Sequence, residues 1–323
     1  MVLTKRHKRT AITVLAAVVL LLVAVLVFFS TRTSQRNLEY PSGDNFGSSA
    51  PIVTLPIERN PITVEIAPGL SFKFDTGSDI STITPEVIDR LDSMGFEVRE
   101  SIYPVAGRDG RGDIDFCLRR YTVDLPFFDN AVTADSLGNV TYTRSAEPKV
   151  FRNIDFVMVD NAVPTLGIDF IEKFVVEYQP KLSTVALYDR VPEHYEVCAR
   201  MKPSRDPIHW SKLGHRYYVR GTVERMPVSM FLDTGLRYSF VKMNASDTTR
   251  NRHPLIDGHT NSFIQEHDCR IDTASWIQIG NREGLQRVYY YNSTEEGHAF
   301  NPLNILYLDV VLDFPGRNFM LRR

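Results

Sequence analysis

Residues 74–78 read FDTGS, and residues 231–235 read FLDTG. One Asp-Thr-Gly tripeptide behind an apolar run is ordinary in a chain of 323 residues, but here a second copy follows 158 positions later, from 75 to 233. The surrounding stretches, VEIAPGLSFKFDTGSDISTIT and VRGTVERMPVSMFLDTGLRYSFV, also correspond. Each indicates a strand, a turn, a second strand that ends in Asp-Thr-Gly, and a polar-to-apolar exit. The repetition predicts two related halves.

The ends of the two copies correspond as well. FVVEYQPKLSTVALYD resembles LDVVLDFPGRNFMLRR, with Pro180 opposite Pro315 and two closing strands around a turn in each. From Asp75 to its proline there are 105 positions (180 minus 75), and from Asp233 there are 82 (315 minus 233). We therefore expect the second half to be the shorter one.

The composition is that of a globular protein, with 43% hydrophobic and 24% charged residues. A net charge of -2 gives no general attraction to nucleic acid, so nucleic-acid binding is not expected. Short apolar runs broken by Gly, Pro, Asn and Asp predict an all-β fold. The clearest helix is expected at 84–95, TPEVIDRLDSMG, where Pro85 suits the first turn and Gly95 the end.

The N-terminal segment carries the pattern of a membrane anchor. A basic tail at 1–10 precedes a run at 11–29 in which Thr13 is the sole polar residue, about long enough to cross a hydrocarbon core of about 30 Å. We expect an uncleaved signal-anchor helix with its N-terminus in the cytoplasm, which makes the lipid bilayer a partner. A polar linker at 30–51 would then lead to a domain in the periplasm, the lumen or outside the cell.

Two facing Asp-Thr-Gly loops suit one particular chemistry. Two carboxyls about 3 Å apart cannot both ionise, so one supplies a base and the other an acid for a water molecule between them. The predicted catalytic residues are Asp75 and Asp233. The glycines allow a close approach and the threonine hydroxyls can hold one loop to the other, so the supporting residues are Thr76, Gly77, Ser78, Thr234 and Gly235. This chemistry needs no cofactor, and no metal-binding motif is present.

At these residues the sequence resembles a known family. FKFDTGSDISTITPEVIDRL is similar to the active-site segment of retropepsin-like aspartic proteases, and NIDFVMVDNAVPTLGIDFIEKF is similar to their later segment. The resemblance implies a bilobal acid-protease barrel fold with pseudo-twofold-related lobes at 52–195 and 196–323. It implies a peptide or protein substrate, and a tandem of two retropepsin-sized lobes fits better than a pepsin.

The second half departs from this pattern. Leu236 stands where the family has a small, usually hydroxylated residue, as Ser78 is in the first half, so Asp233 should lose a hydrogen-bond donor and have a raised pKa. The apolar-apolar-Gly element is missing, with NPLNIL at 301–306 where it is expected. In the first half, 103–123 is the candidate for the hairpin that closes over substrate in this family.

The leading interpretation is thus a membrane-anchored aspartic endopeptidase, with a monomer favoured. Two alternatives stay open: a catalytically impaired protease-like domain that binds extended peptides, and an enzyme active only when the first lobe forms a homodimer. The three cysteines, Cys117, Cys198 and Cys269, allow one disulfide and one free thiol, and spacing does not choose the pair.

Overall fold

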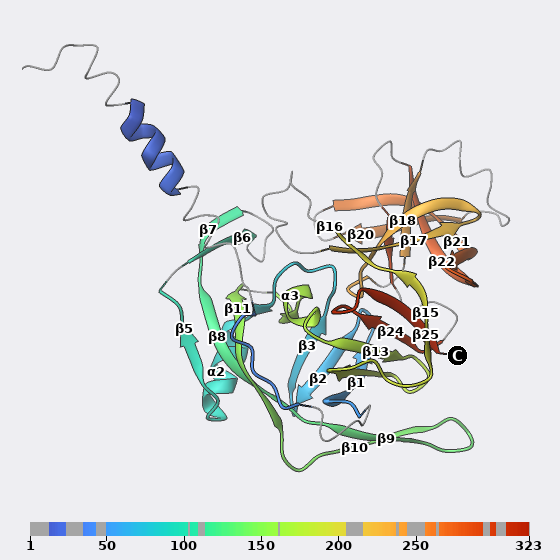
Figure 1. The fold of residues 1–323 in the computed structure, drawn as a ribbon, viewed down its shortest axis with the longest axis horizontal. Coiled ribbons are helices and arrows are strands. Elements are labelled where there is room, and N and C mark those ends of the chain that lie inside the picture. The colour runs from blue at the N-terminus through green and yellow to red at the C-terminus, as the bar shows by residue number, and fades with distance from the viewer. Residues whose placement is uncertain are drawn as a thin grey trace, which may run out of the picture.

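A computed structural model of the chain describes residues 13–23, 35–42, 50–102, 104–108, 114–160, 162–204, 216–236, 239–243, 256–262, 265–292, 298–301 and 308–322. This part of the chain is mostly β, as predicted (Figure 1). The strands of the first half are β1 (Val53–Arg59), β2 (Thr63–Ala67), β3 (Leu70–Phe74), β4 (Thr82–Ile83), β5 (Val98–Glu100), β6 (Val105–Arg108), β7 (Ile114–Leu118), β8 (Arg120–Phe127), β9 (Asn130–Ala134), β10 (Val140–Arg144), β11 (Lys149–Met158), β12 (Thr165–Leu166), β13 (Val175–Gln179) and β14 (Thr184–Tyr188).

The second half contributes β15 (Tyr195–Arg200), β16 (Lys202–Ser204), β17 (Arg216–Val223), β18 (Met226–Leu232), β19 (Ser239–Met243), β20 (Ile256–Ser262), β21 (Gln265–Ile279), β22 (Arg282–Asn292), β23 (His298–Phe300), β24 (Val310–Asp313) and β25 (Asn318–Arg322). Two helices, α2 (Pro85–Ser93) and α3 (Ile168–Ile171), belong to the first half. The helix predicted at 84–95 is confirmed as α2, with Thr84 as its N-cap residue, proline in its first turn and Gly95 at a φ of +79° beyond its end.

Six strands join the two halves. Their order within a 13-stranded sheet is β15-β25-β24-β13-β14-β1, so that exchanging β1 with β15, β14 with β25 and β13 with β24 reproduces the same arrangement. At the centre β13 and β24 are antiparallel, with Val175 opposite Asp313 and Tyr178 opposite Val310. Pro180 and Pro315 occupy the two corresponding turns, as the repeat predicts. We call these six strands the linking sheet.

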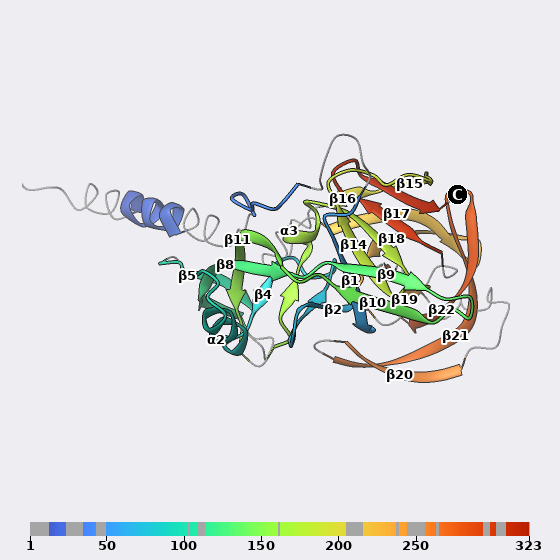
Figure 2. The same cartoon turned by 90° about the horizontal axis from the view of Figure 1, so that it is seen from below.

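Beyond the linking sheet, each half surrounds its Asp-Thr-Gly with the same four-strand order. The first half has β3-β12-β4-β11 and the second has β18-β23-β19-β22. In both, the strand before the Asp runs parallel to its neighbour, the next pair is antiparallel and the third is parallel. Figures 1 and 2 show β8 and β11 of the first half and β21 and β22 of the second half on opposite sides of the molecule.

Side-chain alternation explains how β3 delivers its aspartate. Leu70, Phe72 and Phe74 are buried, whereas Ser71 and Lys73 are partly exposed. Successive side chains in a strand point to opposite faces, so the apolar set faces the core. Fully burying one such aromatic side chain contributes about 1.5–3 kcal/mol, which fixes the register of the strand and therefore the position of Asp75 directly after it.

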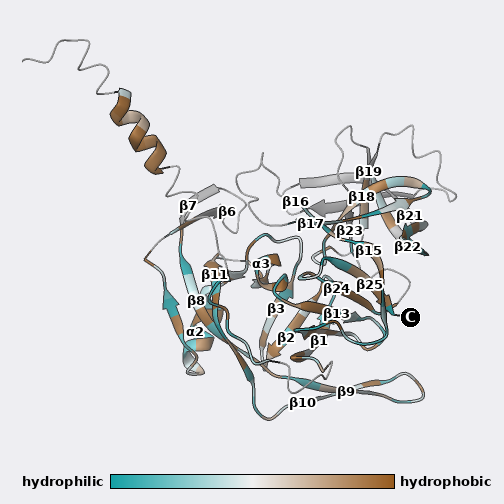
Figure 3. Ribbon diagram, viewed as in Figure 1, coloured by the Kyte–Doolittle hydropathy of each residue, from teal (hydrophilic) through white to brown (hydrophobic). Residues whose placement is uncertain are grey.

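The membrane-spanning helix predicted over 11–29 is wrong. The described chain has helix at 13–23, which is eleven residues (23 minus 13, plus one), or about 16 Å at 1.5 Å per residue. Apart from Thr13 its residues are apolar (Figure 3), but no helix within the described residues is both long and apolar enough to cross a membrane. The predicted single-pass location, with a cytoplasmic N-terminus and an exported domain, is overturned by this finding.

Part of the predicted linker contacts the first half. Gln35 is buried, and its amide nitrogen donates to the Asp155 carbonyl and to Asp169 Oδ2, each at 2.9 Å. The Tyr40 ring lies edge-on to Phe174 with centroids 4.9 Å apart. Residues 35–42 therefore pack on the body beside β11 and α3.

Candidate active site

The two Asp-Thr-Gly loops interlock through their threonines. The Thr76 N–H donates to Thr234 Oγ1 at 3.0 Å, and the Thr234 N–H donates to Thr76 Oγ1 at 3.0 Å. Each hydroxyl then donates across the interface, Thr76 Oγ1 to the Leu232 carbonyl at 2.9 Å and Thr234 Oγ1 to the Phe74 carbonyl at 2.6 Å. Both threonines are buried. Four hydrogen bonds therefore connect residues 156 to 160 positions apart, in the way that the two tripeptides predict.

Each aspartate lies against the glycine of the opposite loop. A Cβ atom added to Gly77 would lie 2.4 Å from Asp233 Cγ, and one added to Gly235 would lie 2.3 Å from Asp75 Cγ. Both distances are far below van der Waals contact, so any side chain would displace the carboxyls. Within its own loop, each glycine N–H donates to the carboxylate, Gly77 to Asp75 Oδ1 at 2.8 Å and Gly235 to Asp233 Oδ1 at 2.9 Å. The structure thus brings the two predicted catalytic residues together.

The electrostatics of the pair favour a proton on Asp233. Burial is the largest cause that raises the pKa of Asp233 well above its ordinary value, and the negative charge of Asp75 and a side-chain hydrogen bond with Asp75 raise it further. The charge of Lys73 and the Gly235 N–H act in the opposite direction. Asp233 keeps some exposed surface, but the protein atoms around it make desolvation the leading effect.

This raised pKa predicts how stability depends on pH. The folded protein holds the Asp233 proton more tightly than the unfolded chain, whose ordinary value is 3.8. The stabilisation is therefore complete below about pH 4 and is lost as pH rises toward the folded-state pKa, at up to about 1.4 kcal/mol per pH unit. Asp233→Asn is neutral at every pH, so urea unfolding between pH 3 and 8 should show a shallower fall than the wild type. The exposed Asp92→Asn should keep the wild-type slope, and equal slopes in all three proteins would contradict the prediction.

Ser78 does not act on Asp75 in the way the sequence suggests. Its hydroxyl donates to the Ile80 carbonyl at 2.9 Å and so stabilises its own turn. A hydroxyl has one hydrogen, so this bond leaves none for the carboxylate. Leu236 consequently removes no carboxylate donor relative to Ser78. The raised pKa of Asp233 agrees with the expectation, but its causes are burial and Asp75 rather than the missing serine.

The apolar-apolar-Gly element that the second half seemed to lack is present in altered form. Leu166 pairs with Phe74, the residue before the first aspartate. Phe300 pairs with Leu232, the residue before the second. The next residue is Gly167 in the first half and Asn301 in the second, so the element ends at 301 and does not begin there. The position expected from the sequence, 301–306, is therefore wrong. The sequence pattern did not identify the element because Asn301 stands in the place of its glycine.

Asn301 makes a contact that the glycine cannot. Both positions keep one bond in common, since the Gly167 N–H donates to Ser81 Oγ at 3.0 Å and the Asn301 N–H donates to Ser239 Oγ at 3.1 Å. In addition, the buried Asn301 side chain donates from Nδ2 to the Leu236 carbonyl. The matching carbonyl in the first half, that of Ser78, accepts a backbone N–H at 2.8 Å instead. A side-chain amide thus holds the loop that carries Asp233.

Replacing Asn301 with alanine should destabilise the second half. The Leu236 carbonyl would lose its amide donor, and a buried acceptor without a partner costs about 1–3 kcal/mol. Urea unfolding would measure this loss. Asn281→Ala, in the exposed turn between β21 and β22, removes the same amide group and should change the free energy of unfolding by less than about 0.5 kcal/mol. Equal effects of the two substitutions would contradict the role assigned to Asn301.

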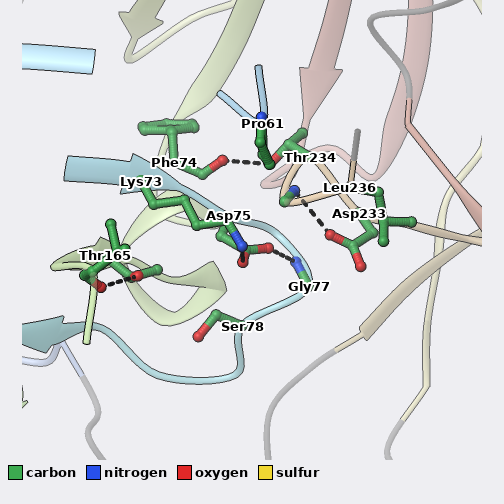
Figure 4. A network of polar contacts seen from close by, with 12 residues as sticks. Pro61, Lys73, Phe74, Asp75, Gly77, Ser78, Thr165, Asp233, Thr234 and Leu236 are labelled. Atoms are coloured by element: carbon green, nitrogen blue, oxygen red, sulfur yellow. Dashed lines mark hydrogen bonds and ion pairs between the residues drawn. The ribbon is translucent and has the colours of Figure 1, made fainter. Parts of the chain in front are cut away.

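A lysine that sequence reasoning passed over lies in the site. Lys73 Nζ is 2.7 Å from Asp75 Oδ2 (Figure 4). The signal for this contact was present, because positions 73 and 75 are two apart at the end of a strand and so lie on the same face.

The hairpin predicted within 103–123 is confirmed in part. β6 and β7 are antiparallel, with Val105 opposite Leu118, and the turn at 109–113 lies outside the described residues. The base of the hairpin is buried against Val157, Val159 and Ile80. Since Ile80 follows the first Asp-Thr-Gly-Ser, the hairpin begins next to the loop that carries Asp75.

The described residues contain no metal-binding cluster and include one free thiol. In the part of the chain that the structure describes, no cluster of three or more His, Cys, Asp and Glu side chains could hold a metal ion. Cys198 is a free thiol. The side chains of Cys117 and Cys269 lie outside the described set, so the predicted disulfide is not tested.

Comparisons with known proteins give distant likenesses. No protein-family model matches the chain, and no curated protein was found to resemble it. The chain is similar to the crystal structure of edgp, with 8% identity, a TM-score of 0.44, and coverage of 85% of this chain and 96% of that one. It is also similar to conglutin gamma, a basic 7S globulin from lupine seeds, with 8% identity, a TM-score of 0.41, and coverage of 84% and 94%. With TM-scores this low, neither likeness carries an inference about function.

Proposed function

We propose that this chain is an aspartic endopeptidase that hydrolyses peptide bonds with Asp75 and Asp233. The observation that carries the proposal is the reciprocal threonine interlock, which holds each carboxyl against the glycine of the opposite loop. Two carboxyls held together cannot easily both ionise, so the pair shares one proton. Such an arrangement lowers the stability of the fold, and a reaction that uses the shared proton gives a reason for it. An acid and a base on opposite sides of one water molecule is the chemistry that this pair supports.

The proton positions define the reaction. Asp75, ionised, takes a proton from the water while the water oxygen bonds to the carbonyl carbon of the peptide. Asp233, protonated, gives its proton to the carbonyl oxygen, which yields a tetrahedral diol. The C–N bond then breaks, the nitrogen leaves with the proton held by Asp75, and a diol hydroxyl returns a proton to Asp233. The products are a carboxylic acid and an amine, and both aspartates regain their starting states.

The remaining parts of the chain take roles that follow from this site. Residues 52–195 and 196–323 would be the two lobes of a retropepsin-like acid protease, related by the exchange seen in the linking sheet. The hairpin of β6 and β7 would cover an extended peptide, since its base packs beside the loop that carries Asp75. The amide and hydroxyl of Thr76 are already bonded within the chain, which favours a dyad inside one molecule over a homodimer of first lobes.

A cleavage assay in labelled water tests the proposal. The full chain is incubated with a denatured, unrelated protein between pH 3 and pH 8 in H₂¹⁸O, and the fragments are identified by mass spectrometry. The expected result is internal cleavage with one ¹⁸O atom in each new terminal carboxyl group, because the water supplies that oxygen directly. A folded protein that cleaves nothing across this range would overturn the proposed enzymatic activity, and saturable binding of the same uncleaved, denatured protein would support the peptide-binding alternative.

A further inference from the structure

Lys73 breaks the symmetry between the two halves of the site. Its ammonium lies 2.7 Å from Asp75 Oδ2, while Asp75 Oδ1 accepts the Gly77 N–H, so each oxygen of this carboxylate has a donor from its own half. The position that corresponds to Lys73 in the second half is Phe231, since both lie two residues before an aspartate. One aspartate is therefore paired with a cation by its own strand, and the other follows an apolar strand.

The surroundings make this cation effective. The side chains of Lys73 and Asp75 are 26% and 11% exposed, so water screens the pair less than it screens a surface ion pair. An ammonium in hydrogen-bond contact favours the ionised form of a carboxyl group. The same charge reaches Asp233, where it opposes the effects of burial and of Asp75.

The other charged and titratable groups near the pair leave this asymmetry in place. Arg216 of β17 lies over the Phe231 ring, 5.1 Å from its centroid, and faces Asp79 with 3.7 Å between its Nε and the carboxylate. Tyr178 of β13 is fully buried behind the loops, and burial, together with the charge of Asp75, raises its pKa, so it stays neutral. Among the described residues, Lys73 and Asp233 are thus the charged groups that contact Asp75 and whose effects on it are compared.

We propose that Lys73 assigns the two catalytic roles, holding Asp75 as the ionised base so that the proton of the pair resides on Asp233. This inference rests on the proposed function and deepens it. Lys73 is a positioning residue, because it acts on the reaction through Asp75. In a symmetric pair the proton could sit on either carboxyl, whereas here the sequence difference between Lys73 and Phe231 decides between them.

The inference has a definite consequence for the pH range of activity. At the alkaline limb, activity is lost when Asp233 gives up its proton, and the pKa of Asp233 rises further once the opposing charge of Lys73 is gone. The alkaline limb of the bell-shaped profile therefore moves to higher pH when the charge is removed.

Three variants test this consequence. Lys73→Met keeps most of the length of the side chain and removes its charge, so the alkaline limb of the kcat/KM profile should shift upward by about one pH unit. Lys73→Arg restores a cation and should return the profile to within about 0.3 units of the wild type. Lys149→Met removes an equivalent lysine, paired with Asp129 at 3.0 Å far along the same half, and should leave the profile unchanged. An unshifted profile in Lys73→Met, or equal shifts in Lys73→Met and Lys73→Arg, would overturn the inference.

A second readout separates this inference from the proposed function. Carboxyl ¹³C NMR titration follows the pair whether or not the protein cleaves peptides. The higher of the two titrations should disappear in Asp233→Asn and should move upward in Lys73→Met, because the charge of Lys73 opposes the raised pKa of Asp233. If the higher titration disappears in Asp75→Asn instead, the assignment of roles is wrong even in an active enzyme. If the titrations behave as expected and no cleavage occurs, the proposed function fails while the action of Lys73 on the pair stands.

Discussion

Replacing Asp75 with asparagine is expected to lower kcat for peptide hydrolysis by about 10²–10⁴-fold, the range that a positioned general base contributes. Asparagine has the shape of aspartate, and its side-chain oxygen can still accept the Gly77 N–H that now reaches Oδ1 at 2.8 Å. The variant therefore keeps the loop but has no carboxylate to accept the proton of the water. Initial rates with one defined peptide from the cleavage assay, measured at the optimum pH, give the ratio.

Asp233→Asn should lose activity to a similar degree, because its amide cannot deliver the proton to the carbonyl oxygen. The exposed Asp92→Asn on α2 makes the same chemical change away from the site and should retain wild-type kcat. Full activity in Asp233→Asn together with an inactive Asp75→Asn would contradict the intrachain dyad. That result would instead support a homodimer in which two first halves supply the carboxyls.

Replacing Thr76 with valine is expected to lower the free energy of unfolding by roughly 2–5 kcal/mol. Valine has the shape of threonine but cannot accept the Thr234 N–H or donate to the Leu232 carbonyl. Both groups lie in the buried interface between the loops, and each one left without a partner costs about 1–3 kcal/mol. Urea unfolding at 25 °C measures the loss, and its size makes Thr76 one of the most sensitive positions in the chain.

The matched control is Thr141→Val, on the exposed face of β10, for which a change within about 0.5 kcal/mol is expected. Thr234→Val should resemble Thr76→Val, and the double variant should cost less than the sum of the two because the threonines share their reciprocal bonds. Additive costs, or a Thr76→Val no worse than Thr141→Val, would show that the interlock does not hold the halves together.

Residue patterns within a single segment were sufficient to predict the strands and the helix that short-range interactions determine. The alternation of Leu70, Phe72 and Phe74 fixes a strand that ends at Asp75, and Pro85 and Gly95 delimit α2. The pairing of the two loops was predictable because the same tripeptide recurs with the same flanking strands. A repeat in the chain implies related halves, and related halves place equivalent loops at a common axis.

The features that the sequence did not predict depend on partners far along the chain. Asn301 reads as an ordinary polar residue until its amide is seen on the Leu236 carbonyl, 65 positions away. The sequence does not show whether the Ser78 hydroxyl donates to the Asp75 carboxylate or to a carbonyl group in its own turn. In the structure it donates to the Ile80 carbonyl. At the N-terminus, hydropathy over 11–29 predicted a membrane-spanning helix, whereas the helix among the described residues there covers 13–23.

The linking sheet has a consequence for the order in which the protein is made. Its last strand, β25, lies between β15 and β24, and β24 is the neighbour of β13 from the first half. A nascent chain that has already completed the first half still lacks β24 and β25, the strands that cover the edge of β13 and that lie far along the chain from it. Pairing of such distant segments is slow, so assembly of the two loops has to wait for β24 and β25. A chain without these strands would therefore carry Asp75 and Asp233 in two halves that the linking sheet does not yet join.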